Sequence, residues 1–436
     1  MNAGVIIFIL LLVLAFLGLP IYLSIGIATM VAMVHAGFPL EAVAQKTFLG
    51  MNSASLLCIP LFILAGNIMA QGITQKLIAA ANIPLGRVRG SLASVTVLSS
   101  ALFGAISGSA AATLSCIGGI MYPKLEEAHY NKGFAASLIA NASPLGLLIP
   151  PSSIQIMYAW VTGQSVLACF LATIVPGLIL MTLLSIINVY ECRHNQDYLD
   201  YNAKKLEAAM AEDLTLGQRF KNAFPALLMP VIILGGIYSG VMTPTEAAAV
   251  AVIYAIPIGF LVYKGLTLKG CKDAFKDAGI TAAVVMFMMF MVMILSRLYV
   301  LLDLPNKMVS IMSGMTDSKI VVLLLVNIFM VIIGMLMDDN SGTLLCGPIL
   351  LPLVVAYGVS PIQFAAILGV NLGMGTITPP AAPLLYLGAL TTKVPVKDML
   401  KPSLKIILFA WIPTLILTTY IPQLSLFLPR LFGFNV

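Results

Sequence analysis

The chain has 436 residues, of which 60% are hydrophobic and only 9% charged, and its formal net charge at pH 7 is +6. Soluble globular proteins carry roughly 25% charged residues, so the charged surface that keeps a large soluble enzyme in water is missing. The composition predicts an all-α integral membrane protein whose surroundings are the lipid bilayer. We expect no nucleic-acid partner.

Ten segments are apolar enough, and about long enough, to cross a bilayer, which takes about 20 residues in a helix. They are residues 2–18, 20–35, 52–70, 133–162, 166–190, 222–241, 243–263, 279–301, 362–392 and 403–422. The first has neither the preceding basic residue nor the cleavage motif of a signal peptide, so we expect it to be retained.

Two further apolar stretches, 90–121 and 318–352, are each interrupted by small and polar residues. The interruptions are ISGSAAAT at 106–113 and MDDNSGT at 337–343. We expect both stretches to be re-entrant helical hairpins that enter and leave on the same side.

The basic residues indicate how the spans are oriented, because Lys and Arg favour the cytoplasm. With the N-terminus outside, 18 of the 23 Lys and Arg residues fall on the inside. The other five are Lys46, Arg297, Lys307, Lys319 and Arg430. Both termini are therefore predicted to lie outside.

The chain reads as two repeats, 1–190 and 222–436, joined by a polar cytoplasmic linker at 191–221. A single constant offset superposes Pro123 on Pro352, the pair at 150–151 on the pair at 379–380, and Gly146 on Gly375. In the predicted topology the corresponding segments face opposite sides. Inverted repeats with broken helices place substrate and ions near the midplane and permit alternating access.

The proline pairs interrupt long helices at 143–153 and 372–382. Proline removes a backbone donor and clashes one turn back, so we expect free carbonyls that suit sodium ions. The set comprises Ser143, Gly146, Gly373, Gly375 and Thr378. The half-helices expected to begin at Pro151 and Pro380 would point amide donors at a carboxylate. The alternative is a plain packing kink.

The hairpin tips add hydroxyl and amide groups that could complete an ion shell; the alternative is that the small residues serve close helix packing. The tip residues are Ser107, Gly108, Ser109 and Thr113 in one hairpin and Asn340, Ser341, Gly342 and Thr343 in the other.

Several polar residues in apolar sequence have two readings. Asp338 and Asp339 lie between apolar runs, where a carboxylate needs a partner or a function; one of them could ligate a cation or organise the tip. Glu246 follows Thr-Pro, so helix capping is expected. Asn67, Asn141 and Asn371 either line the cavity or bond between helices.

The six cysteines are scattered without a CxxC pair, so we expect packing residues and not disulfides or a metal cluster. The three histidines lie far apart in the sequence, which gives a histidine metal site little support. We expect no organic cofactor.

Five segments together resemble, in order and spacing, the large membrane subunit of TRAP (tripartite ATP-independent periplasmic) transporters of the DctM type. They are FGAISGSAAATLSCIGGIMYP, LGLLIPPSS, GVMTPTEAAAVAVIYA, GMLMDDNSGTLLCGPILLP and NLGMGTITPPAAPLLYLGA. The resemblance covers residues 4 to 422 and implies a multi-pass protein of the bacterial inner membrane with periplasmic termini. It also implies an elevator mechanism that carries a small organic anion with co-transported Na⁺.

The resemblance further implies two separate partners, a small four-helix membrane subunit and a periplasmic substrate-binding protein. The substrate would be a carboxylate such as a dicarboxylate, sialic acid or another sugar acid. Carried onto this sequence, the sodium sites would comprise Ser107, Ser109, Asn141 and Gly146 in one half and Asp338, Asn340, Gly373, Gly375 and Thr378 in the other. The substrate would lie near Ser152, Ser153 and Thr376.

Three other readings compete. A membrane hydrolase is disfavoured because adjacent aspartates point to different faces of a helix and no neighbouring base activates the serines. A passive channel would need a continuous pore. A stand-alone sodium/carboxylate symporter of the same fold, without a binding protein, is the serious alternative.

Overall fold

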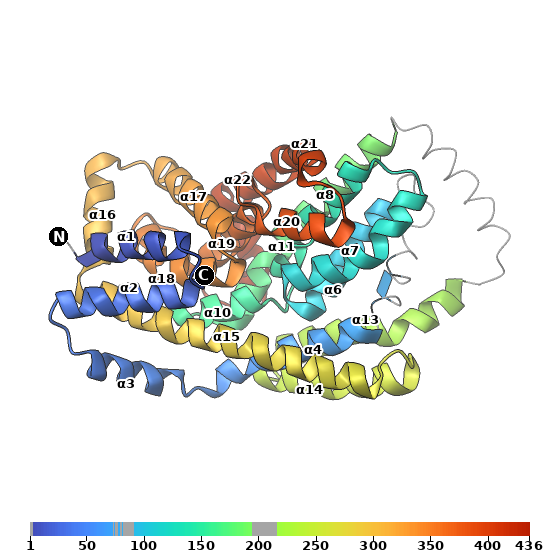
Figure 1. The fold of residues 1–436 in the computed structure, drawn as a ribbon, viewed down its shortest axis with the longest axis horizontal. Helices are drawn as coiled ribbons and strands as arrows, with labels where there is room; N and C mark the ends of the chain where they lie inside the picture. Colours follow the sequence, from blue (N-terminus) through green and yellow to red (C-terminus); the bar gives the residue numbers. More distant parts are fainter. Residues whose placement is uncertain (1–2, 73, 75–76, 79–80, 82–90, 194–215) are drawn as a thin grey trace.

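The computed structural model describes residues 3–72, 74, 77–78, 81, 91–193 and 216–436, and every regular element in this part of the chain is helical (Figure 1). The first half contains α1 (Ala3–Phe16), α2 (Ile21–His35), α3 (Leu40–Met51), α4 (Cys58–Gly72), α6 (Ser91–Ser107), α7 (Ala110–Glu127), α8 (Lys132–Ala142), α9 (Leu145–Leu148), α10 (Ser153–Thr162) and α11 (Val166–Cys192). The second contains α13 (Leu216–Tyr238), α14 (Pro244–Pro257), α15 (Leu268–Leu301), α16 (Leu304–Met315), α17 (Lys319–Leu336), α18 (Asp339–Ala356), α19 (Pro361–Gly375), α20 (Pro383–Thr392), α21 (Val396–Ile406), α22 (Ile412–Tyr420) and α23 (Pro422–Leu431).

Six helices in the described residues are long and apolar enough to cross a membrane, or seven if the bent pair formed by α8–α9 and α10 counts as one span. Shorter apolar helices, including α2, α4 and α19, add to these. The chain is thus multi-pass, while the count of ten spans stays a prediction.

One face of α17 consists of exposed apolar side chains, as expected for a helix in contact with lipid. Ile320, Leu324, Ile328 and Ile332 recur every four residues and are exposed, whereas Val322, Val326 and Met330 are buried. Residues four apart share one side of a helix. An exposed stripe of large apolar side chains suits hydrocarbon and not water.

The predicted hairpins are both helix–turn–helix units. In the first, α6 packs against α7 across the turn at Gly108 and Ser109, and in the second α17 packs against α18. A broken helix follows each hairpin, and a further helix follows each break: α11 begins at Val166 and α21 at Val396. The order of elements is therefore the same in this part of the two halves, while the inverted repeat stays a prediction.

The two halves interlock. Helix α8 lies against α21, and α11 lies against α19. Hydrogen bonds join the halves: Ser137 Oγ donates to the Met399 carbonyl (2.8 Å) and Gln155 Nε2 to the Ala365 carbonyl (3.1 Å), both buried, and the partly buried Tyr158 Oη donates to the Pro361 carbonyl (2.7 Å). The broken helices are consequently held in one body.

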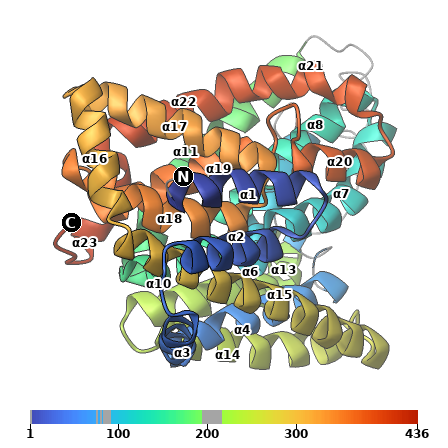
Figure 2. The same cartoon turned by 60° about the vertical axis from the view of Figure 1, so that its left-hand side comes forward.

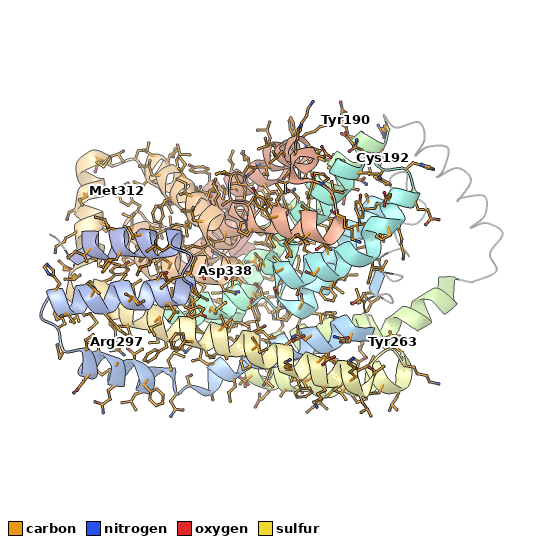
Figure 3. All side chains as sticks on the ribbon, in the orientation of Figure 1. Tyr190, Cys192, Tyr263, Arg297, Met312 and Asp338 are labelled. Carbon is orange, nitrogen blue, oxygen red and sulfur yellow. The ribbon has the colours of Figure 1, made fainter. Side chains whose placement is uncertain are left out.

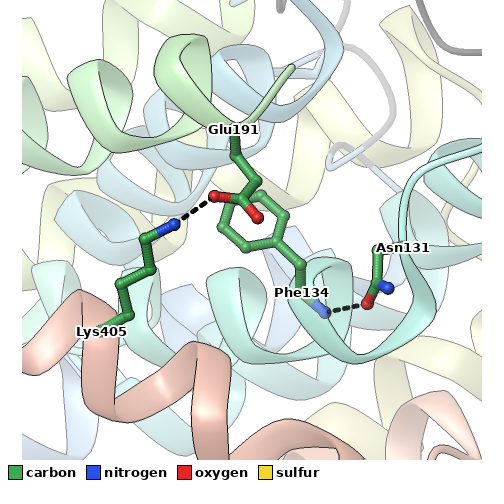
Figure 4. Close-up of polar contacts among 4 residues, drawn as sticks. All are labelled: Asn131, Phe134, Glu191 and Lys405. Carbon is green, nitrogen blue, oxygen red and sulfur yellow. Dashed lines mark hydrogen bonds and ion pairs between the residues drawn. The ribbon is translucent and has the colours of Figure 1, made fainter. Parts of the chain in front are cut away.

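Figure 4 shows two polar contacts at one end of this body. Lys405 of α21 forms an ion pair with Glu191 of α11 at 2.6 Å, and Asn131 caps α8 by accepting from the Phe134 N–H at 3.1 Å. Because both charged side chains are partly exposed, the ion pair is worth at most about 1 kcal/mol. The two halves are therefore held together mainly by the packing of their helices and not by this ion pair.

Helices α1, α2, α4, α14 and α15 form a second group along one side of the molecule, seen in Figures 1 and 2. Helix α4 packs on α14 and α15, α15 packs on α2, and α2 packs on α1. Gly26 allows α2 close to α15, because a Cβ there would lie 2.7 Å from the Met291 sulfur. Helix α4 also touches α6, and α15 touches α18, so this group flanks the hairpins.

The structure corrects several expectations. Helices α3, α16 and α23 occupy segments that the prediction left wholly or largely outside the spans. The second half-helices begin at Ser153 and Pro383, not at Pro151 and Pro380, because the residues directly after each proline pair remain non-helical. Most of the linker at 191–221 lies outside the described residues.

Two smaller expectations concern packing and capping. Cys58, Cys169, Cys192 and Cys346 are buried, as expected of packing residues. Glu246 completes a capping box with Thr243: its carboxylate accepts from the Thr243 N–H (2.7 Å), and the Thr243 hydroxyl accepts from the Glu246 N–H (3.3 Å).

Thr243→Ala should lower the stability of the folded protein by about 1 kcal/mol, since an N-cap side chain is worth about that much. Thermal unfolding in detergent measures the change. Thr182→Ala is the control, because Thr182 is exposed and its hydroxyl bonds only within its own helix. Equal unfolding temperatures for the two variants would contradict the capping role.

Candidate functional site

The first hairpin tip gathers oxygen atoms around Gly108. Ser109 caps α7 by accepting from the Ala112 N–H (3.4 Å), and the Thr113 hydroxyl donates to the Ser109 carbonyl (2.7 Å). The Ser107 hydroxyl lies 3.2 Å from that of Thr113. Gly108 has φ +60°, a conformation that glycine adopts without steric cost.

The break in the following helix lies directly on this tip. A Cβ at Gly146 would lie 3.1 Å from Thr113 Oγ1, 3.4 Å from the Ser109 carbonyl oxygen and 3.0 Å from the Cα of Gly104. Ser107, Ser109, Thr113 and Gly146 therefore form one cluster, which we call the first oxygen cluster. Hydroxyl and carbonyl oxygens are the ligands that hard cations prefer.

The second tip is built on the same plan with a carboxylate in the capping position. Asp338 caps α18, and the repeat offset places it on Ser109 of the first tip. Its Oδ2 accepts from the N–H groups of Asn340 (3.1 Å) and Ser341 (3.3 Å), and its Oδ1 accepts from the Ser341 hydroxyl. The Thr343 hydroxyl donates to the Asp339 carbonyl (2.8 Å), as Thr113 does to Ser109. Asp338 therefore organises the tip.

Close backbone contact between glycines recurs in both halves. A Cβ at Gly375 would lie 2.6 Å from the Cα of Gly334 and 2.8 Å from the Val331 carbonyl oxygen, and one at Gly104 would collide with the Cα of Gly146. Gly104 and Gly334 were not among the predicted site residues. Their signal in the sequence is that the repeat offset relates them to within one position.

The two halves meet at Ser153. Its N–H (3.3 Å) and its hydroxyl (2.8 Å) both point to the Gly108 carbonyl, and the hydroxyl lies 3.4 Å from Asn340 Oδ1. Ser153 is the first residue of α10, Gly108 precedes α7, and Asn340 is in the first turn of α18. The N-termini of three helices thus converge on one point, near the middle of the molecule, where Figure 3 labels Asp338.

Other predicted residues bond elsewhere. Asn141 Nδ2 donates to the Ser137 carbonyl (2.8 Å) and to Ser403 Oγ of α21 (3.0 Å), so it faces α21. Thr376 and Thr378 fold back onto their own segment, donating to the carbonyls of Gly373 (2.9 Å) and Met374 (2.6 Å).

The breaks also release fewer carbonyls than expected. The Ser143 carbonyl accepts from the Gly146 N–H (3.1 Å), the Gly375 carbonyl from the Thr378 N–H (3.0 Å) and the Gly373 carbonyl from the Thr376 hydroxyl. Tight local turns replace the helix ladder at these positions. Each carbonyl retains a second lone pair.

Four buried oxygens near the breaks have no hydrogen-bond partner among the described residues: Asn141 Oδ1, Asn371 Oδ1, Ser152 Oγ and Gln155 Oε1. The repeat offset relates Asn141 to Asn371 to within one position, but the two side chains bond to different helices, Asn141 to α21 and Asn371 to α17. The Asn371 amide nitrogen donates to Asn327 Oδ1 (2.9 Å), which confirms bonding between helices for this side chain. Buried polar atoms are ordinarily partnered, so these oxygens are open to a donor or a cation.

Residues 8–424 match the model of the family described as the tripartite ATP-independent periplasmic transporter, DctM component. The chain belongs to the DctM family. This confirms the resemblance found in the sequence, and the family is one of membrane transport proteins and not of enzymes in the usual sense.

Individual DctM relatives match over nearly their full length. The C4-dicarboxylate TRAP transporter large permease protein DctM of Pseudomonas aeruginosa is 34% identical, with 91% of each chain covered. The sialic acid TRAP transporter large permease protein SiaM of Vibrio cholerae is 33% identical, with 96% of each covered. The crystal structure of the Alcanivorax borkumensis YdaH transporter, described as having an unusual topology, matches with a TM-score of 0.60 at 15% identity over 87% of each chain. This likeness supports a transporter-type fold.

Proposed function

We propose that this DctM-family chain imports a small organic anion together with sodium ions by an elevator movement. The observation that supports an anionic substrate is the convergence of three helix N-termini at Ser153. Each helix N-terminus carries a partial positive charge from the helix dipole, so the three together attract a carboxylate. The relatives named for C4-dicarboxylate and sialic acid support a carboxylate substrate.

The first oxygen cluster supports sodium coupling. Two hydroxyls and a carbonyl lie together beside Gly146, whose missing side chain lets these oxygens approach its backbone closely. In the second half, Asp338 already accepts three hydrogen bonds at the tip. Its remaining role toward a cation would be electrostatic, through its negative charge beside Asn340.

The grouping of the helices supports the proposed elevator movement. The hairpins and broken helices form one interlocked body, and the group around α4, α14 and α15 flanks it. In the proposal the flanking group stays fixed while the body carries substrate and ions across the membrane. The small membrane subunit and the periplasmic binding protein are separate partners, as the family implies.

Reconstitution tests the proposal. Liposomes that contain this chain and its small membrane subunit should take up the anion only when a sodium gradient and the cognate binding protein are both present. Uptake without the binding protein would favour the stand-alone symporter, which the comparisons do not favour. Uptake driven equally well by a potassium gradient would overturn sodium coupling.

Thr113→Val should raise the sodium concentration for half-maximal uptake by about tenfold, because one hydrogen-bonding oxygen near a charge is worth about 1.5 kcal/mol. The variant keeps the shape of the side chain and removes the hydroxyl. Uptake against sodium concentration measures the effect, with Thr182→Val as the control on an exposed helix face. An unchanged sodium response in Thr113→Val would place the ion elsewhere.

A further inference from the structure

A pocket distant from the hairpin tips lies between α3 and the end of α15. Its volume is about 390 Å³, and it is lined by Phe38, Pro39, Val43 and Lys46 on one side and by Ser296, Arg297, Val300 and Leu301 on the other. Figure 3 labels Arg297 between these two helices. The lining combines two cations with apolar walls, which is the chemistry of an amphiphilic anion site.

Arg297 is held in place but keeps unused donors. Its Nη2 donates to the Lys46 carbonyl (3.2 Å), and a Cβ at Gly50 would lie 3.8 Å from this atom. Its Nε is buried without a hydrogen-bond partner. A guanidinium has five N–H donors in a fixed fork that matches phosphate.

Neither cation is neutralised by a carboxylate. Within the described ranges, neither Arg297 nor Lys46 forms an ion pair. The acidic residue closest in sequence to Arg297 is Asp303, whose Oδ1 accepts from Asn306 Nδ2 (2.6 Å). The pocket therefore carries a net positive charge that an anion would balance.

The position along α15 indicates the depth of the pocket in the membrane. This helix is 34 residues long and apolar enough to span, and Arg297 lies one turn before its end at Leu301. Lys269, Lys272 and Lys276 lie at the opposite end. Cations within a turn of a span's end reach the headgroup level.

Exposed apolar side chains continue outward from the pocket. Phe48 and Val300 are each 70% exposed, and Leu49 is 63% exposed. Phe48 and Leu49 lie just beyond Lys46 on α3, so a phosphate held by the cations would have apolar surface beside it for an acyl chain. A free phosphate or an acidic protein segment would leave this surface without a partner.

We propose that this pocket binds an anionic phospholipid through its phosphate, with Arg297 and Lys46 contacting the headgroup. In the predicted orientation the lipid belongs to the outer leaflet. By contacting both helices, the lipid would hold α3 against α15 within the flanking group. This inference does not depend on which substrate the protein transports.

Native mass spectrometry of the purified chain, with phosphatidylglycerol or phosphatidylethanolamine added in detergent, tests the proposal. The wild-type protein should retain one phosphatidylglycerol more strongly than phosphatidylethanolamine and should unfold at a higher temperature with it. Removing each cation, in Arg297→Gln and Lys46→Gln, should weaken retention about fivefold, since each charge near an anionic lipid contributes about 1 kcal/mol.

Lys319→Gln is the matched control, because Lys319 is predicted on the same side of the membrane but donates to the Gly358 carbonyl (2.9 Å) away from the pocket. It should retain the lipid as the wild type does. If Arg297→Gln does not fold, Arg297→Lys and Lys46→Gln give the same comparison. The proposal would be overturned if inorganic phosphate raised the unfolding temperature as much as phosphatidylglycerol does. It would also be overturned if Lys46→Gln retained the lipid as the wild type does but no longer bound the periplasmic binding protein.

Discussion

Gly375→Ala is expected to abolish uptake and to lower the stability of the folded protein by about 1–3 kcal/mol, the usual cost of overpacking. The added methyl group would lie 2.6 Å from the Cα of Gly334 and 2.8 Å from the Val331 carbonyl oxygen. Both are backbone atoms, so no side-chain rotation relieves the clash. Helix α19 would have to move away from α17, which displaces the second break from its tip.

Gly119→Ala provides the control for this substitution. Gly119 is also in a helix, α7, but a Cβ there would meet no atom within 4 Å. The same change should leave transport intact and could add up to about 1 kcal/mol of stability, since alanine favours a helix over glycine. Thermal unfolding and uptake by reconstituted protein measure both variants. Wild-type uptake by Gly375→Ala would show that the glycine contact does not position the break.

The overall arrangement was predictable because it rests on local and periodic signals. Apolar runs of span length mark helices such as α11 and α15, and the small polar clusters mark the turns at Gly108 and Asp338. The constant offset between the halves predicts the register of the repeat from the sequence alone. It relates the two capping residues, Ser109 and Asp338, which share a structural position despite different chemistry.

Short amphipathic helices were missed for a physical reason. Helices α3 and α16 have 12 residues each, too few to cross a bilayer, and both include charged or polar residues. A search for apolar runs of about 20 residues passes over them. Their polar residues suggest connecting loops, although both helices pack beside the spans.

The hydrogen-bond partners that join one half to the other could not be predicted from the sequence. Asn141 was placed with Ser107 and Ser109, but its amide nitrogen contacts Ser403 in the other half of the chain. That contact depends on α8 packing against α21, which no local pattern encodes. The same holds for Ser153: the sequence placed it near the tips, but only the packing of the helices shows that it touches both.

Ser153→Ala is expected to lower uptake at limiting substrate by about tenfold, because a hydrogen bond to a charged group is worth about 1.5–3 kcal/mol. The hydroxyl donates to the Gly108 carbonyl of the first tip (2.8 Å) and lies 3.4 Å from Asn340 Oδ1 of the second. Without it the tips lose their common contact at the point where the three helix N-termini converge. Initial uptake rates at several substrate concentrations measure the loss.

Two further variants separate a role for this hydroxyl from a general loss of stability. Ser153→Thr keeps the hydroxyl and should recover part of the uptake. Ser185→Ala removes a hydroxyl that bonds only to the Met181 carbonyl of its own helix (2.8 Å), so it should transport as the wild type does. If Ser153→Ala and Ser185→Ala behaved alike, the meeting point of the tips would not be where the anion binds, because truncating its central hydroxyl would then matter no more than truncating any other.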